Sequence, residues 1–189
     1  MTSQPKAQFP EEQSPQGSFV RQGDAFRSWV TSDGSSAFPA AAGRYRLYVS
    51  FACPWAHRTI IVRALKGLED AIDMRVVDPI RDERGWHIGD WFLSEVYLSA
   101  DPAYCGRVTV PVLWDTHTKH IVSNSDDDIM RMFETEFNAF GNATPDLYPV
   151  QHRAAIDALN DVIYETLNDG VYKAGFATSQ KAYEDAAYR

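Results

Sequence analysis

The sequence has little cysteine and no long apolar run. Two cysteines, Cys53 and Cys105, occur in 189 residues, too few for the disulfide framework of a small secreted protein. No stretch approaches the ~20 uninterrupted apolar residues that cross a bilayer, and residues 1–19 lack the apolar core of a signal peptide. We therefore expect a cytoplasmic protein in which any redox role rests on individual thiols.

Positive charge is also scarce. The chain carries 18 basic and 26 acidic side chains, a formal net charge of −8, and 44% of its residues are apolar. This composition is typical of soluble globular proteins, and it lacks the basic surface through which proteins hold nucleic acid or anionic membranes. We expect a small or neutral partner, with no nucleic acid and no membrane.

The N-terminal residues 1–43 differ in composition from the rest of the chain. They are rich in Pro, Gln, Ser, Gly and Ala and show no sustained period, which predicts an N-terminal arm or surface loop. The length of the whole chain suits one complete core and part of a second. Parts of the arm should dock on that body, because the arm contains four large apolar side chains: Phe19, Phe26, Trp29 and Phe38.

Residues 44–140 follow the pattern of an α/β domain. One helix is expected from Asp126 toward Phe133, and another after Cys53, where five apolar residues are spaced to share one helical face: Ile60, Ile61, Ala64, Leu65 and Leu68. Between them, residues 79–108 form a long polar and aromatic connection. This order predicts a thioredoxin-like domain, in which helices cover the faces of a mixed sheet. The expected strands are 45–49, 74–78, 110–114 and 120–122.

The last segment, residues 150–189, predicts the beginning of an all-α domain. Apolar residues recur every three or four positions and predict a helix that ends near Gly170. A turn and one further helix should follow. The periodic residues are Ile156, Leu159, Ile163 and Leu167.

Cys53 is the main candidate for chemistry. A helix N-terminus stabilises a thiolate through unpaired amides and the helix dipole, and lowers a cysteine pKa from ~8.5 toward about 3.5–7.5. Ala56 stands where a dithiol oxidoreductase has its second cysteine, so glutathione is the natural resolving thiol. A packing role is the alternative for Cys53, and a metal site with His57 lacks two further ligands. His57 and Arg58 lie either near the thiolate or in solvent.

Four further positions could bind an extended peptide such as glutathione. A cis Val110–Pro111 bond would leave the Val110 backbone free to pair with the peptide, whereas an ordinary edge-strand proline is the alternative. At the start of the next helix, Asp126 could pair with the γ-glutamyl ammonium group and Ser125 with its carboxylate. Plain N-capping explains these two residues equally well. Trp86 either covers the tripeptide or belongs to the core.

Three long segments carry a specific resemblance to a known family. They are Ser-Phe-Ala-Cys-Pro-Trp-Ala-His-Arg (50–58), Arg-Val-Thr-Val-Pro-Val-Leu-Trp-Asp (107–115) and Gly-Val-Tyr-Lys-Ala-Gly-Phe-Ala (170–177). Together they resemble the xi-class glutathione transferases, the glutathionyl-hydroquinone reductases, from about Arg44 to the end of the chain. The resemblance implies glutathione-dependent reduction of S-glutathionyl-hydroquinones, with glutathione as co-substrate and no metal.

The resemblance also implies roles for particular residues. Cys53 would attack the glutathionyl sulfur, release the hydroquinone and leave a mixed disulfide, which a second glutathione resolves. Trp86 matches the tryptophan that lies over glutathione in the family. Tyr172 matches a tyrosine that assists proton transfer to the leaving aromatic carbon. The segment that lines the tripeptide corresponds to Arg107, Val108, Thr109 and Val110.

Two features depart from the family pattern. The family usually has Glu-Ser at the helix start where this chain has Ser125 and Asp126, so both chemical types are kept in swapped order. Family members also continue beyond Arg189, through helices that complete the hydroquinone pocket and typically the homodimer, so we expect a partial helical domain here. Two alternative functions stay open, an omega-like thioltransferase or dehydroascorbate reductase and a non-catalytic glutathione-transferase-like binding module.

Overall fold

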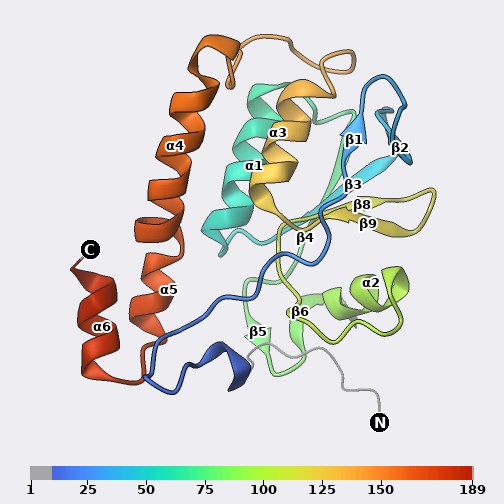
Figure 1. The fold of residues 1–189 in the computed structure, drawn as a ribbon. Coiled ribbons are helices and arrows are strands. Elements are labelled where there is room, and N and C mark those ends of the chain that lie inside the picture. The colour runs from blue at the N-terminus through green and yellow to red at the C-terminus, as the bar shows by residue number, and fades with distance from the viewer. Residues whose placement is uncertain (1–9, 189) are drawn as a thin grey trace. The chain divides into compact units, whose positions relative to one another are not determined.

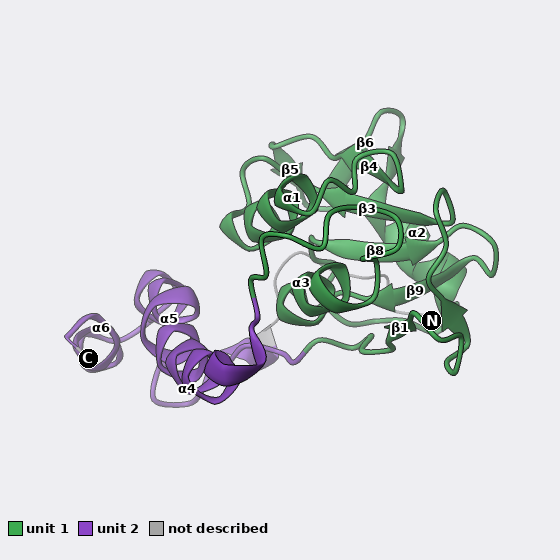
Figure 2. Cartoon of the chain, turned by 90° about the horizontal axis from the view of Figure 1, so that it is seen from above, with its two compact units in different colours: residues 1–7, 24–147 green, residues 8–23, 148–189 purple. Residues whose placement is uncertain are grey.

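The structure, a computed structural model, describes residues 10–188. These residues form two compact units, coloured green and purple in Figure 2. Unit 1 contains the described residues 24–147, and unit 2 combines residues 10–23 with residues 148–188. The expected arm is therefore shared between the two units, and the expected domain boundaries at 43, 140 and 150 stay predictions.

A four-stranded mixed sheet forms the centre of unit 1 (Figure 1). Its strand order is β4-β3-β8-β9. Strand β3 pairs in parallel with β4 and antiparallel with β8, and β9 completes the sheet antiparallel to β8. This is the mixed sheet predicted for a thioredoxin-like domain. The strands are β3 (Tyr45–Val49), β4 (Ile72–Val76), β8 (Val112–Asp115) and β9 (His120–Ser123).

The central strand β3 is covered on both faces. Leu47 and Val49 are fully buried, as the alternation in the sequence indicates, but Tyr48 on the opposite face is only 3% exposed. When helices cover both faces of a sheet, a central strand is buried on both sides, and neither side needs polar residues. Strand β4 begins at Ile72, two residues before the expected start, because Ile72 is buried opposite Tyr45.

Two helices, α1 (Pro54–Leu65) and α3 (Asp126–Thr135), lie side by side (Figure 1). The expectation that Ile61 and Leu65 lie on the buried face of α1 is wrong, because each is 45% exposed. The buried face instead contains Trp55, Ala56, Thr59 and Arg63.

The polar residues on the buried face of α1 satisfy their own hydrogen bonds. The Thr59 hydroxyl donates to the Ala56 carbonyl at 2.7 Å, and Arg63 Nε donates to the Ile72 carbonyl at 2.9 Å. Burial of a polar side chain costs little once its groups are paired. Residue type alone therefore does not identify the buried side of this helix.

The connection 79–108 contains structure that the sequence analysis missed. Its strands form a small antiparallel sheet of their own. A helix follows, α2 (Leu93–Ala100), which packs against β6 and β9. Leu93, Val96 and Tyr97 are its buried residues, and their spacing of three and four is a helical signal. The strands are β5 (Arg81–Asp82), β6 (Gly85–Ile88) and β7 (Trp91–Phe92).

The part of the expected arm that belongs to unit 1, residues 24–43, packs against the central sheet, as expected. It contains two short parallel strands, β1 (Val30–Thr31) and β2 (Phe38–Pro39). Ahead of them the chain runs along β9, where Ser28 N donates to the Val122 carbonyl at 2.9 Å. Phe26 packs edge-on against Tyr97, with 5.7 Å between the ring centroids. The large apolar side chains of this segment thus join the core of the sheet.

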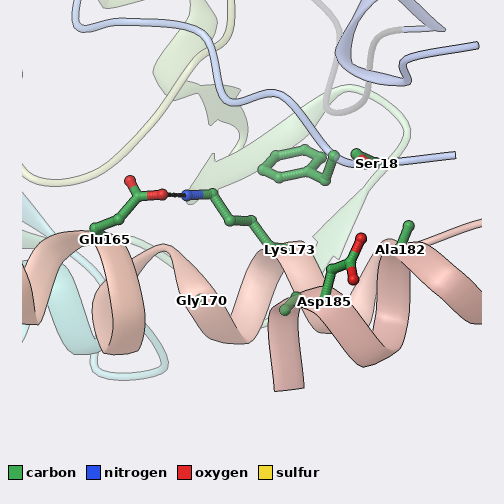
Figure 3. Close-up of a pocket in the computed structure, with 8 residues that line it drawn as sticks. Ser18, Glu165, Gly170, Lys173, Ala182 and Asp185 are labelled. Carbon is green, nitrogen blue, oxygen red and sulfur yellow. Dashed lines mark hydrogen bonds and ion pairs between the residues drawn. The ribbon is translucent and has the colours of Figure 1, made fainter. Parts of the chain in front are cut away.

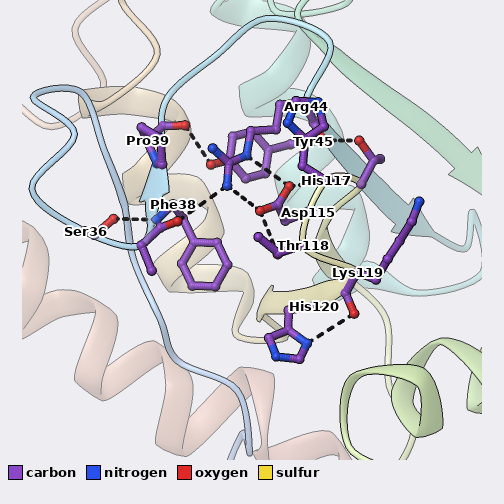
Figure 4. A network of polar contacts seen from close by, with 12 residues as sticks. Ser36, Phe38, Pro39, Arg44, Tyr45, Asp115, His117, Thr118, Lys119 and His120 are labelled. Atoms are coloured by element: carbon purple, nitrogen blue, oxygen red, sulfur yellow. Dashed lines mark hydrogen bonds and ion pairs between the residues drawn. The ribbon is translucent and has the colours of Figure 1, made fainter.

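A network of polar contacts lies where β3 begins and β8 ends (Figure 4). Arg44 holds Asp115 with two hydrogen bonds, at 3.0 and 2.5 Å, and Thr118 donates a third at 2.8 Å. Burial alone would raise the pKa of Asp115, but hydrogen bonds from Arg44, the His117 backbone and Thr118 outweigh it and lower the pKa to about 2. The turn between β8 and β9 is therefore built around an ionised carboxylate.

Unit 2 is helical. Helix α4 (Arg153–Ile163) follows a short 3-10 turn, η2 (Val150–His152), and continues as a single π-turn, η3 (Tyr164–Asn168). Two shorter helices, α5 (Gly170–Gly175) and α6 (Gln180–Ala187), complete it. The predicted helix that ends near Gly170 and the further helix are both present. No helix within residues 10–188 is long and apolar enough to cross a membrane.

The N-terminal part of unit 2 packs on its last two helices. It includes a 3-10 turn, η1 (Pro10–Glu12). Thr178 N donates to the Gly17 carbonyl at 2.9 Å, and the Phe19 ring lies 5.3 Å from that of Phe176. Leu159 on α4, by contrast, is 58% exposed, and α4 has no buried residue. The apolar face of α4 therefore lacks a partner within the described residues of unit 2.

Candidate functional site

Cys53 occupies the turn from β3 into α1, as predicted. It is the N-cap residue of the helix, with extended backbone angles, and Pro54 takes the first helical position. The chain reaches this point through a tight turn, in which Cys53 N donates to the Ser50 carbonyl at 3.1 Å. The side chain is partly exposed and is not in a disulfide. A partly exposed thiol beside the unpaired amides of a helix N-terminus is the setting of a reactive cysteine.

The cis bond predicted between Val110 and Pro111 is present, and it lies against Cys53. The Cys53 thiol donates to the Val110 carbonyl, with 3.6 Å between sulfur and oxygen. Val110 itself is buried. The fold thus brings together two segments that are separated by 57 residues in the chain. A peptide whose sulfur reached Cys53 would lie beside the Val110 backbone.

The segment that leads to Val110 is held in place by two residues, Tyr97 and Asn124, that the sequence did not single out. The Tyr97 hydroxyl donates to the Thr109 carbonyl at 3.0 Å, and Asn124 Nδ2 contacts the Thr109 hydroxyl at 3.4 Å. Burial raises the pKa of Tyr97 to about 12, so the hydroxyl keeps its proton and remains a donor. These contacts give the segment a fixed shape.

The two outer residues of the same segment differ in their surroundings. Val108 is buried in the core cluster, whereas Arg107 is partly exposed. The Arg107 carbonyl accepts a hydrogen bond from the Tyr104 hydroxyl at 2.6 Å. Arg107, Val108, Thr109 and Val110 therefore form one anchored stretch that ends at the sulfur of Cys53. Their role in binding a tripeptide stays a prediction.

Trp86 lies on β6 and belongs to the same core cluster as Val108 and Val110. It is 8% exposed, and the Arg81 guanidinium lies 5.2 Å from its ring centroid. Its indole Nε1 is buried without a hydrogen-bond partner among the described residues. A buried donor without a partner is costly, which suits a ligand that supplies an acceptor. Packing in the core accounts for the ring of Trp86, and its contact with glutathione stays a prediction.

Ser125 and Asp126 lie at the start of α3 in different roles. Ser125 is the N-cap, and its hydroxyl accepts a hydrogen bond from Asp128 N at 3.4 Å. Asp126 is only 6% exposed, and Arg58 Nη1 lies 2.9 Å from its Oδ2. N-capping therefore accounts for Ser125, but it does not account for Asp126, whose carboxylate is buried beside a guanidinium.

The surroundings of Asp126 perturb its ionisation. Burial raises its pKa to about 7, against the opposing charge of Arg58, and the nearby carboxylates of Asp127 and Asp24 push in the same direction as burial. A carboxyl group that titrates near neutral pH is a frequent feature of functional sites. Arg58, which the sequence left either near the thiolate or in solvent, contacts the start of α3.

Tyr172 lies on α5 in unit 2. Its ring stacks on Phe176, with 6.2 Å between centroids, and the Arg21 guanidinium lies 5.4 Å from its centroid. Arg21 comes from the N-terminal part of the same unit. The structure thus gives Tyr172 a defined aromatic and cationic environment, and its role as a proton donor stays a prediction.

A cavity of about 230 Å³ lies within unit 2 (Figure 3). Lys173, one of its lining residues, contacts Glu165 at 2.5 Å and Asp169 at 3.4 Å, and the lining residue Asp185 is held by Lys181 at 2.7 Å. The charged lining residues Glu165, Lys173 and Asp185 are therefore each paired with a charged side chain of opposite sign. Within residues 10–188, no group of three or more His, Cys, Asp and Glu side chains is placed to hold a metal ion.

Comparison with known proteins agrees with this geometry. Residues 52–136 match the family model for the N-terminal domain of glutathione S-transferases. Glutathionyl-hydroquinone reductase YqjG of Escherichia coli K12 is 50% identical over 195 residues, which cover 93% of this chain and 60% of that protein. The chain thus spans about 60% of the length of this curated relative.

Solved structures of the same kind superpose well. The xi glutathione S-transferase of Phanerochaete chrysosporium has a TM-score of 0.84 and 47% identity, and the match covers 89% of this chain and 62% of that one. The glutathione-bound structure of YqjG from Escherichia coli K-12 has a TM-score of 0.80 and 50% identity, and the match covers 87% of this chain and 62% of that one. Over the length that it spans, this chain belongs to the xi class of the glutathione S-transferases.

Proposed function

We propose that this chain uses glutathione to reduce S-glutathionyl-hydroquinones through a mixed disulfide at Cys53. The observation that carries the proposal is the position of the Cys53 sulfur, at the N-terminus of α1 and 3.6 Å from the Val110 carbonyl. One cysteine with no partner thiol in its motif suits a reaction in which glutathione supplies the second sulfur. The 50% identity to a glutathionyl-hydroquinone reductase supports the same choice of substrate.

The proposed reaction balances in two steps. The Cys53 thiolate attacks the glutathionyl sulfur of the substrate, the sulfur–carbon bond breaks, and its electron pair goes to the aromatic carbon, which takes a proton. The ring is thereby reduced, and the two sulfurs are oxidised to a mixed disulfide. A second glutathione thiolate then attacks the glutathione sulfur of that disulfide and releases oxidised glutathione and the Cys53 thiolate.

Glutathione would bind as an extended peptide across this site. Its cysteinyl part would pair with the backbone of Val110, and Trp86 would cover the peptide and donate its indole N–H. The γ-glutamyl ammonium group would pair with Asp126, and its carboxylate would lie at Ser125 on the N-terminus of α3, where amides favour an anion. The remaining contacts would come from the segment that contains Arg107, Val108 and Thr109.

Other parts of the proposal concern the rest of the protein. Tyr172 would donate the proton that the aromatic carbon takes, because a phenol is a suitable general acid for a developing carbanion. A homodimer is the assembly we propose, since the exposed apolar side chains of α4 offer a surface for association. A cytoplasmic location follows from a reaction that consumes reduced glutathione.

The substrate class is tested by comparing two reactions of the same preparation. Glutathionyl-menadione and dehydroascorbate are supplied separately, with glutathione in excess, and the release of menadiol and of ascorbate is measured. We expect turnover of glutathionyl-menadione at least tenfold above that of dehydroascorbate. The reverse order would replace the proposal by an omega-like dehydroascorbate reductase, and turnover of neither compound would favour a glutathione-binding module without catalysis.

A further inference from the structure

The start of α3 holds an unusual concentration of carboxylates. Three consecutive aspartates form its first turn, and Asp24 from the N-terminal segment contributes a fourth negative charge to the same region. Two guanidinium groups offset only part of the charge of these four carboxylates, so the net charge of the cluster is negative. A negative, partly desolvated cluster attracts a cationic group. The charged residues are Asp24, Asp126, Asp127, Asp128, Arg27 and Arg58.

The two arginines hold their partners differently. Arg27 pairs with Asp128 through two hydrogen bonds of 2.7 Å each, which satisfies that carboxylate. Arg58 Nη2 donates to Asp127 Oδ1 at 2.7 Å, and this contact fixes the orientation of its guanidinium.

The contact between Arg58 and Asp126 is close but is not a hydrogen bond. Arg58 Nη1 lies 2.9 Å from Asp126 Oδ2, yet neither buried atom has a hydrogen-bond partner within the described residues. The charge of Arg58 therefore acts on Asp126 without using up the hydrogen-bonding capacity of the carboxylate. Asp126 is the buried member of the acidic first turn, and its carboxylate is left able to accept hydrogen bonds from a ligand.

We propose that Arg58 is a positioning residue that keeps the buried Asp126 carboxylate ionised for the γ-glutamyl ammonium group, and that glutathione binding therefore strengthens with pH near neutrality. This inference rests on the proposed function, because it assumes that glutathione binds beside Cys53. Arg58 lies on α1, and Cys53 is the N-cap of that helix, so one end of α1 would position both the nucleophile and the charge that prepares the recognition of the peptide.

The direction of the pH dependence follows from the groups that face Asp126. Arg58 on α1 favours the ionised form, whereas Asp127 on α3 and Asp24 on the N-terminal segment oppose it together with burial, and the balance places the pKa at about 7. The fraction of ionised Asp126 then rises from about one tenth at pH 6 to about three quarters at pH 7.5. Binding of an ammonium group should strengthen on the order of fivefold over this interval, because a typical α-amino group has lost about a third of its protons at pH 7.5.

The test measures binding alone, without the thiol chemistry. S-methylglutathione is titrated calorimetrically into Cys53→Ser protein between pH 6 and pH 7.5, so that neither thiol titrates. We expect about fivefold tighter binding at pH 7.5 than at pH 6 in this background. Asp126→Asn should bind weakly and without this pH dependence. Arg58→Gln should lose about tenfold in affinity at pH 7.5, with its titration displaced to higher pH, and Arg58→Lys should restore most of the affinity.

Two control variants separate this effect from a general loss of charge. Arg46→Gln removes an arginine from an ion pair with Asp73, outside the cluster, and His57→Gln removes an exposed imidazole from the same helix as Arg58. The Arg46→Gln and His57→Gln variants should both keep the pH dependence of S-methylglutathione binding. A pH-independent affinity, or an Arg58→Gln variant with normal circular dichroism and an unchanged profile, would overturn the inference alone. Absence of S-methylglutathione binding at every pH would also contradict the proposed function.

Discussion

Replacing Cys53 with serine should lower the turnover of glutathionyl-menadione by on the order of 10³-fold or more. The serine hydroxyl stays protonated at neutral pH and cannot form a disulfide with glutathione. The first step of the proposed reaction therefore loses its nucleophile, and the second step loses the mixed disulfide that glutathione attacks. Steady-state release of menadiol, with glutathione in excess, measures this loss. Retention of more than a tenth of the wild-type rate would contradict a mechanism through Cys53.

The same substitution should leave the fold intact, which separates loss of chemistry from loss of structure. Cys53 is the N-cap of α1 and makes no capping hydrogen bond, and serine is a preferred residue at this position. Thermal unfolding should therefore be unchanged or occur at a slightly higher temperature. Cys105→Ser is the matched control, because Cys105 is the other cysteine of the sequence and is exposed. It should keep both stability and turnover.

Replacing Lys66 with methionine should cost about 3–5 kcal/mol of unfolding free energy. Lys66 is only 1% exposed, and its Nζ contacts Glu134 Oε1 at 3.3 Å and the carbonyls of Ala143 and Pro145 at 3.4 and 3.3 Å. These contacts tie the end of α1 to α3 and to the segment after it. Methionine fills a similar volume, but it leaves Glu134 as a buried charge without its ammonium partner.

A double variant and an exposed pair make this prediction specific. Lys66→Met with Glu134→Leu should recover at least half of the lost free energy, because no unpaired charge remains buried. Lys181→Met removes a lysine from an exposed pair with Asp185 and should change stability by less than about 0.5 kcal/mol. Urea unfolding followed by tryptophan fluorescence measures all three variants. A loss below about 1 kcal/mol for Lys66→Met would show that the buried pair does not hold these elements together.

The parts of the fold that depend only on residues close together in the chain could be predicted from the sequence. The alternation around Leu47 and the proline after Cys53 each favour one conformation of their own neighbours. The strand and the strand-to-helix turn are accordingly present. The same holds for the acidic first turn of α3, because carboxylates favour a helix N-terminus. The cis bond before Pro111 was expected from the thioredoxin-like fold, because proline by itself only makes a cis bond less costly.

The features that depend on tertiary contacts could not be predicted in this way. Whether Arg58 faced solvent or the site depended on how α1 packs against α3, which its own helix does not reveal. Tyr97 supports Thr109 only because the fold brings α2 next to that residue, and α2 itself was missed among the aromatic residues of the connection. Asp126 looks like a helix-capping residue in the sequence, and only its burial beside Arg58 distinguishes it from its two neighbours.

The most direct test of the account is whether Cys53 exchanges with glutathione. The protein is incubated with oxidised glutathione at neutral pH, digested without reducing agent and examined by mass spectrometry. We predict one glutathione on the peptide that contains Cys53, formed equally in Cys105→Ser protein and removed by reduced glutathione. An unmodified Cys53 under conditions that modify Cys105 would contradict the central claim.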